Sequence, residues 1–217
     1  MKYVDRLLTE TDYLSLLEQL EELERDRPFC RHGLTHLLDT ARIAWILVLE
    51  KKGSCMHPGN KEKVAQPERE LAVEERSCDG EDIVKEAIYL AALLHDLGRM
   101  REYEDGTPHH IAGAAEAERL LARIRYPEER AEWILAAVAG HRRGEGGDSK
   151  GAGAWERGTE ARNWECGTEA GDWENSTSAR LAALLRWADK KSRNCFFCRA
   201  RMDCNWKEEE RNESITL

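Results

Sequence analysis

The sequence contains no long apolar run and no sustained alternation of apolar and polar residues. No segment approaches the ~20 consecutive apolar residues of a membrane span, and the first residues, MKYVDRLLTETDY, lack the order of a signal peptide. We therefore expect a cytoplasmic protein that does not enter a membrane. Because no window shows the two-residue period of a strand, the predicted fold class is all-α, a helical bundle.

An excess of positive charge is also missing. The formal net charge is -9, with 41% hydrophobic and 35% charged residues, and such a field opposes binding to nucleic acid or to an anionic membrane. A small phosphorylated substrate would need a local cluster of Arg, Lys or metal to overcome this repulsion. The length of 217 residues suits a single domain, residues 1–217, with insertions.

The seven cysteines form no even-numbered disulfide framework, and without export we expect reduced thiols. Cys195, Cys198 and Cys204 lie in the C-terminal tail, residues 195–217, and Cys30 precedes a predicted helix. Four thiolates in this arrangement could bind a structural zinc ion or an iron–sulfur cluster. One CxxC with two scattered cysteines is equally compatible with plain reduced thiols, so both interpretations stay open.

Apolar residues at helical spacing predict six helices, over residues 9–25, 34–50, 82–96, 109–125, 128–142 and 178–191. The third is apolar nearly all round from Ala87 to Leu94, which indicates a central, buried helix.

Two polar stretches, residues 53–80 and 143–177, are predicted to be loop insertions. The second contains three nonapeptide copies with tryptophans at positions 155, 164 and 173. Since each copy offers one large apolar side chain, the copies cannot bury a core alone. An expanded loop is favoured over a partner-binding arm.

His95 and Asp96 interrupt the central helix in LAALLHDLGR, where a buried carboxylate must be paired or bound to a metal. His36, His141 and Asp189 also lie on apolar stripes of predicted helices. Any one of them is explained by a satisfied core histidine or a helix-terminal carboxylate. Together they would supply the mixed nitrogen and oxygen ligands that suit Fe, Mn, Ni, Co or Zn.

The order His36, then His95–Asp96 in LLHDLGR, then Asp189 in WADKKSR resembles the HD superfamily of metal-dependent phosphohydrolases. The similarity spans roughly residues 28–195 apart from the two insertions, and it implies an all-α HD-domain bundle. His32 competes for the first ligand position, but HLLDTARIA, which begins at His36, matches the first motif of the family.

Members of this superfamily with two metal ions add two histidines between the doublet and the last aspartate. His141 matches one of these positions, and either His109 or His110 matches the other, with the spacing to Gly113 favouring His109. The resemblance thus implies one or two divalent transition-metal ions, with Asp96 as the bridge between two. Members that cleave diadenosine tetraphosphate have a similar ligand order, which suggests a nucleotide substrate by analogy.

The implied reaction is hydrolysis of a phosphate ester or anhydride of a nucleotide or small metabolite. A metal ion lowers the pKa of its bound water to about 7 and so makes hydroxide available, and Asp96 would accept a proton if one ion is present. Arg99 and Lys190 are expected at the rim as cations for the substrate, with Arg142 as a weaker third. Each is also explained as a solvated cation at a helix end.

Two other functions share these residues. The first is a di-iron oxygenase of the HD fold, which the ligand set allows. The second is a nonenzymatic sensor that binds a nucleotide through a degenerate site. Every ligand position is occupied in this sequence, which favours an enzyme over the sensor.

Overall fold

The computed structural model describes residues 1–55, 79–142 and 173–215, and these residues form helices without a strand, which confirms the all-α prediction. None of the helices in these ranges has the length and apolar content needed to cross a membrane. The helices are α1 Lys2–Glu10, α2 Tyr13–Leu23, α3 Leu34–Cys55, α4 Asp79–Leu94, α5 Arg99–Asp105, α6 His109–Arg123, α7 Glu128–Gly140 and α8 Trp173–Lys191, followed by the 3-10 turns η2 Cys195–Phe197, η3 Arg201–Asp203 and η4 Glu208–Glu210.

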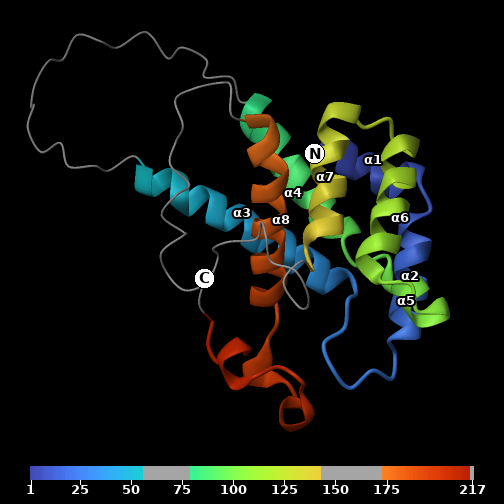
Figure 1. Ribbon diagram of the computed structural model, residues 1–217, viewed down its shortest axis with the longest axis vertical. Helices are drawn as coiled ribbons and strands as arrows, with labels where there is room; N and C mark the ends of the chain where they lie inside the picture. Colours follow the sequence, from blue (N-terminus) through green and yellow to red (C-terminus); the bar gives the residue numbers. More distant parts are fainter. Residues whose placement is uncertain (56–78, 143–172, 216–217) are drawn as a thin grey trace, which may run out of the picture.

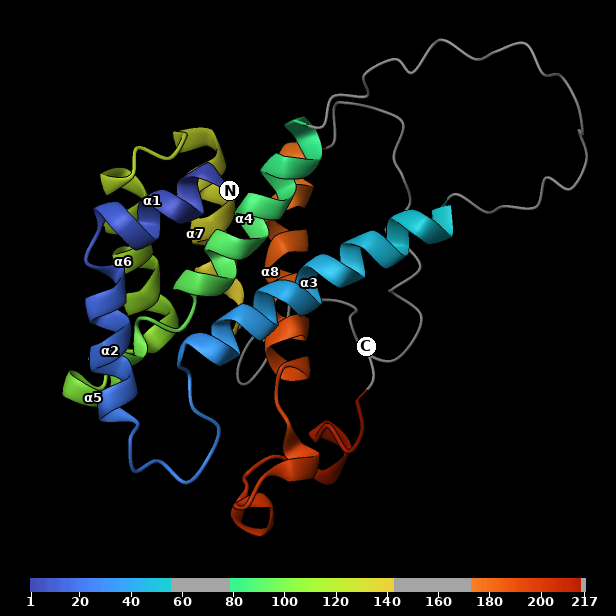
Figure 2. The same ribbon diagram turned by 180° about the vertical axis from the view of Figure 1, so that it is seen from behind.

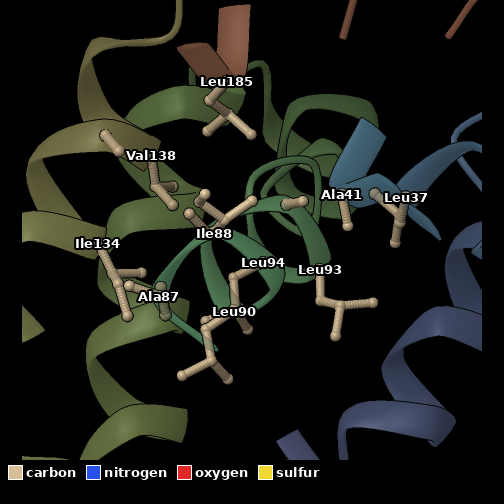
Figure 3. Packing of buried hydrophobic residues seen from close by; sticks show 14 of the residues in the cluster. Leu37, Ala41, Ala87, Ile88, Leu90, Leu93, Leu94, Ile134, Val138 and Leu185 are labelled. Atoms are coloured by element: carbon tan, nitrogen blue, oxygen red, sulfur yellow. The ribbon is translucent and has the colours of Figure 1, made fainter. Parts of the chain in front are cut away.

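Helix α4 is the centre of the bundle, as its apolar surface predicted. It packs against α1, α3, α6, α7 and α8, and Figures 1 and 2 show it crossing the middle of the molecule. Leu90, Leu93 and Leu94 are at most 1% exposed, and each contributes roughly 1.5–3 kcal/mol by burial. Figure 3 shows these leucines among side chains from α3, α7 and α8. The buried end of α4 therefore holds the chain directly after it, from residue 95 on, in a fixed position.

The helix predicted over residues 9–25 corresponds to α2, and α1, which lies almost entirely before that range, was not predicted. Thr11 is extended and separates them. Its hydroxyl donates to the carbonyl of Leu7 at 2.5 Å and accepts the N–H of Tyr13 at 3.1 Å, so this side chain satisfies backbone groups that the break leaves open. The Tyr13 hydroxyl then donates to the carbonyl of Leu93 at 3.0 Å, which ties α2 to the end of α4.

Helix α4 ends at Leu94, two residues earlier than predicted, so His95 and Asp96 lie in the turn of residues 95–98. The sequence analysis also missed α5, which follows this turn directly. A Cβ on Gly98 would lie 2.0 Å from the carbonyl oxygen of His109 and 2.3 Å from the nitrogen of Gly113. Only glycine permits this backbone approach, and the approach holds the start of α6 against the turn.

The predicted insertions lie mostly outside the described residues, as do the tryptophans at 155 and 164. Helix α3 extends through Cys55, beyond the expected stop at Gly53. Helix α8 begins at Trp173, five residues before the predicted start at Ser178. Most of the third nonapeptide copy is therefore helical, contrary to its prediction as loop.

The chain after α8 folds back on the end of that helix. The Asn212 side-chain amide donates to the carbonyl of Lys190 at 2.7 Å and to that of Arg193 at 2.8 Å. These bonds satisfy carbonyls that a helix terminus leaves without partners. Figure 1 shows the tail in red beyond the lower end of α8.

Candidate metal centre

Six titratable residues from five parts of the fold converge at the end of α4. Each lies at or near the end of a helix, where a side chain does not have to pack among the apolar residues of the core. They are His36 in the first turn of α3, His95 and Asp96 in the turn after α4, His109 at the start of α6, His141 directly after α7, and Asp189 in the last turn of α8.

The first ligand group consists of His36, His95, Asp96 and Asp189, whose ligand atoms all lie within 4.8 Å of one another. Nε2 of His36 is 3.0 Å from Oδ1 of Asp189 and 3.4 Å from Oδ2 of Asp96. Nε2 of His95 is 3.0 Å from the same Oδ2 of Asp96. Two imidazoles and two carboxylates thus face one point, as the sequence predicted.

The second ligand group consists of Asp96, His109 and His141, within the same distance limit. Nε2 of His109 lies 3.3 Å from Nε2 of His141 and 3.9 Å from Oδ1 of Asp96. Asp96 therefore belongs to both groups and turns one oxygen toward each. This is the geometry of a carboxylate that can bridge two ions.

Each of the four histidines has its Nδ1 held by an acceptor outside the cluster. Because Nδ1 carries a proton, Nε2 is the nitrogen that faces the cluster, and it offers an electron pair to a metal ion when it is not protonated. This arrangement is common among histidines that bind metals. The acceptors are the carbonyl of Ala92 for His95 at 2.8 Å, the carbonyl of Val138 for His141 at 2.6 Å, the Glu102 carboxylate for His109 at 3.0 Å and the Ser192 hydroxyl for His36 at 2.9 Å.

Within the part of the chain that the structure describes, three buried atoms of the cluster form no hydrogen bond of good geometry, although they lie 3.0–3.4 Å from one another or from Asp189: Nε2 of His36, Nε2 of His95 and Oδ2 of Asp96. Leaving a buried polar atom unpaired costs about 1–3 kcal/mol, and buried polar atoms are almost always satisfied. All three atoms face the first ligand group. A metal ion is a ligand that these residues fit, since it would satisfy all three atoms at once.

The electrostatics of the cluster keep its two carboxylates ionised. Burial alone would raise the pKa of Asp96, yet the positive charges of His95 and Arg99 hold it well below its usual range. Burial likewise opposes a charge on His95, but the Asp96 carboxylate raises the pKa of His95 to about 10. The pKa of Asp189 is also held well below its usual range, against burial, by Arg193. Both carboxylates are therefore in the ionised form that a metal ligand must have.

Two buried arginines hold the carboxylates in place. Nε of Arg99 donates to Oδ1 of Asp96 at 2.8 Å, and Nη2 of Arg193 donates to Oδ1 of Asp189 at 2.5 Å. Arg99 was expected at an open rim of the site. It is instead buried, with 6% of its surface exposed, so this expectation is wrong. Its side chain orients Asp96.

The other expected rim cations lie closer to solvent. Lys190 is half-buried and forms no ion pair with an acid of the described ranges, and Arg142 is exposed. Their role toward a substrate stays a prediction.

His110 and His32 do not join the ligand groups. His110 is half-buried, with its ring 6.0 Å from that of His109. His32 is buried, and its Nδ1 lies 2.5 Å from Oε1 of Glu24, which also accepts the hydroxyl of Tyr103 at 2.6 Å. The structure thus brings His109 and His36, the preferred residues of each pair, into the cluster.

The residues that support the ligands were not predicted from the sequence. Ser192 and Arg193 end the stretch WADKKSR, three and four positions after Asp189, and this spacing within one helical turn was a usable signal. Glu102 precedes His109 by seven residues across a helix boundary, and no spacing rule identifies it.

Comparison with known proteins agrees with this site. The HD domain family model matches residues 33–194, a range that contains every member of both ligand groups. A protein of Clostridium beijerinckii (strain ATCC 51743 / NCIMB 8052), described as an uncharacterized protein, is 31% identical over 209 residues, which cover 96% of this chain and 95% of that relative. No solved structure shows a significant match. The chain therefore belongs to the HD domain family.

Proposed function

We propose that this protein is a metal-dependent phosphohydrolase that cleaves a phosphate ester or anhydride of a nucleotide or other small metabolite. HD domains are generally metal-dependent hydrolases, and the chain belongs to this family. The observation that carries the proposal is the shared position of Asp96, a buried carboxylate that belongs to two adjacent ligand groups. Nothing in the packing of a core requires this arrangement, whereas a centre of two metal ions would use it.

The proposed cofactor is one or two divalent ions of Fe, Mn, Ni, Co or Zn, which suit a set of imidazole and carboxylate ligands. Such an ion supplies an activated water near neutral pH and binds phosphoryl oxygens. The protein contributes orientation. Ser192 and Glu102 hold the imidazoles of His36 and His109 in the ligating tautomer, and Arg99 keeps Asp96 ionised and fixed.

A cavity beside His36 offers a place for the substrate. Its volume is about 510 Å³, within the range of small-molecule sites. Two arginines line it among several glutamates, and they differ in their contacts. Arg25 pairs with Glu22, whereas Arg31 is exposed and forms no ion pair with a described acid. We therefore assign Arg31 as the cation that meets the negative charge of the substrate.

The test is a hydrolysis screen of protein purified without chelator and reloaded separately with manganese, iron, cobalt, nickel or zinc. The substrates are p-nitrophenyl phosphate, bis-p-nitrophenyl phosphate, mononucleotides and dinucleoside polyphosphates. Phosphate or nucleotide release should depend on added metal and disappear in Asp96→Asn. The exposed Asp5→Asn variant is the control, and it should retain full activity.

Two other outcomes would overturn the proposal. Consumption of dioxygen by the iron-loaded protein, without hydrolysis of any phosphate compound, would identify an oxygenase. Nucleotide binding without turnover under every metal would identify a sensor.

A further inference from the structure

The C-terminal tail has a defined path but almost no apolar core of its own. Between residues 194 and 215, Cys195 and Ala200 are the buried apolar side chains, while Phe197 and Met202 are 81% and 90% exposed. Small segments that bury so little usually depend on a metal ion or a covalent link. The tail therefore needs a source of stability beyond apolar burial.

Its cysteines are placed at the corners of tight turns. Cys195 begins η2, and the N–H of Cys198 donates to the carbonyl of Cys195 at 3.1 Å. Cys204 directly follows η3, and its N–H donates to the carbonyl of Arg201 at 3.4 Å. A CxxC pair closed by such a turn, followed by a third cysteine after a second turn, is typical of structural zinc sites.

The fourth cysteine comes from the other end of the chain. Cys30 lies in the segment between α2 and α3 and is half-buried, with its carbonyl accepting Nε of Arg27 at 2.9 Å. Burial raises the pKa of Cys30, and the charges of Cys195, Cys198 and Cys204 raise it further. All four cysteines are at least partly buried, whereas the tail residues Phe197, Arg199 and Asp203 are exposed. The thiols therefore face inward from an otherwise exposed tail, and their effect on the pKa of Cys30 agrees with this placement.

We propose that Cys30, Cys195, Cys198 and Cys204 bind one structural zinc ion. Four thiolates complete a tetrahedral zinc site without an open position for catalysis. The sulfur atoms do not form one of the groups with ligand atoms within 4.8 Å among the described residues, so zinc must draw them closer. Cys30 and the three tail cysteines also lie outside residues 33–194, the range that the HD domain family model matches.

The zinc site would support the metal centre from outside. Ser192 and Arg193, which hold His36 and Asp189, lie between α8 and Cys195. Binding of Cys195 and the rest of the tail to zinc would therefore restrain Ser192 and Arg193. This inference does not depend on the reaction that the protein catalyses.

Cobalt substitution separates this site from the first. The variant Asp96→Asn, which removes the shared ligand of the HD centre, is purified, stripped and loaded with cobalt. We expect it to bind about one equivalent with the near-ultraviolet charge-transfer bands of thiolate ligation. Those bands should vanish in Asp96→Asn/Cys195→Ser and persist in Asp96→Asn/Cys166→Ser. Cys166 lies outside the described residues and is the matched control.

Thiol alkylation of the unmutated protein guards against a misfolded variant. In the zinc-loaded protein, mass spectrometry should show the four proposed ligands protected from iodoacetamide until a chelator is added. Rapid alkylation of these cysteines in the zinc-loaded protein, or cobalt binding without thiolate bands, would overturn the proposal. Brown protein with acid-labile sulfide would overturn the assignment of zinc in favour of an iron–sulfur cluster.

Discussion

The hydroxyl of Ser192 lies 2.9 Å from Nδ1 of His36, although the two residues are 156 positions apart in the chain. The same hydroxyl lies 2.6 Å from the carbonyl of Asp189 and donates its proton there. It must then accept the proton of His36 Nδ1, since it has one proton to give. Ser192 thus orients His36 of α3 and is itself held by the backbone carbonyl of Asp189 in α8.

The variant Ser192→Ala should bind metal at the first ligand group roughly 10–100-fold more weakly, the usual cost of removing such a supporting partner. Isothermal titration with manganese or zinc measures this change. The exposed Ser15→Ala is the control. Unchanged affinity in Ser192→Ala would show that His36 does not depend on this contact.

Glu102→Ala addresses the second ligand group separately. It removes the carboxylate that holds Nδ1 of His109, and we expect a 10–100-fold loss of affinity for one ion while the other ion is retained. The exposed Glu104→Ala is the matched variant from the same helix. Equal loss of both ions in Glu102→Ala would argue that the two groups do not bind separately.

Arg31→Ala should raise KM for the substrate roughly tenfold, equivalent to about 1.4 kcal/mol, with a smaller effect on kcat. The reason is that Arg31 forms no ion pair with a described acid and lines the cavity next to His36. Steady-state kinetics of Arg31→Ala and of Arg25→Ala, in which the paired arginine is removed, provide the comparison. A larger KM in Arg25→Ala than in Arg31→Ala would reverse the assignment.

His32 should make the stability depend on pH. Burial lowers its pKa to about 4, against the attraction of Asp96 and Glu24, whereas an unfolded histidine has a pKa of about 6.5. The unfolded state therefore binds more protons between these values, and stability must fall as the pH is lowered through this range. The contribution is at most roughly 3 kcal/mol, because one pKa unit corresponds to about 1.4 kcal/mol.

Urea unfolding of chelator-treated protein at pH values from 7 to 4 measures this slope. In His32→Gln, which cannot take up the proton, the loss of stability on acidification should be smaller. An identical slope in both proteins would show that protonation of His32 does not contribute to the pH dependence of stability.

The bundle and the ligand groups were predictable from local signals, while the residues that support the ligands were predictable only in part. The apolar surface from Ala87 to Leu94 identifies α4 as the centre, and a histidine or aspartate on an apolar stripe is conspicuous in any sequence. The break at Thr11 fell inside the predicted helix because a single hydroxyl decides it, and apolar spacing does not report such a contact.

The partners of the ligands depend on contacts between distant segments. Arg99 illustrates this limit. Its position after HDLG is compatible with an exposed cation, and its actual role follows from the turn that buries it against Asp96. Periodicity identifies which side chains face inward, but it does not specify which of them meet.

The most direct test of the metal centre is elemental analysis of protein purified anaerobically without chelator, for the unmutated chain and for Asp96→Asn. Because Asp96 is shared by both ligand groups, we expect the variant to lose the metal of this centre together with phosphate release, while circular dichroism stays helical. Metal at unchanged stoichiometry in Asp96→Asn, with turnover intact, would contradict the assignment of Asp96 as the shared ligand and with it the proposed hydrolase.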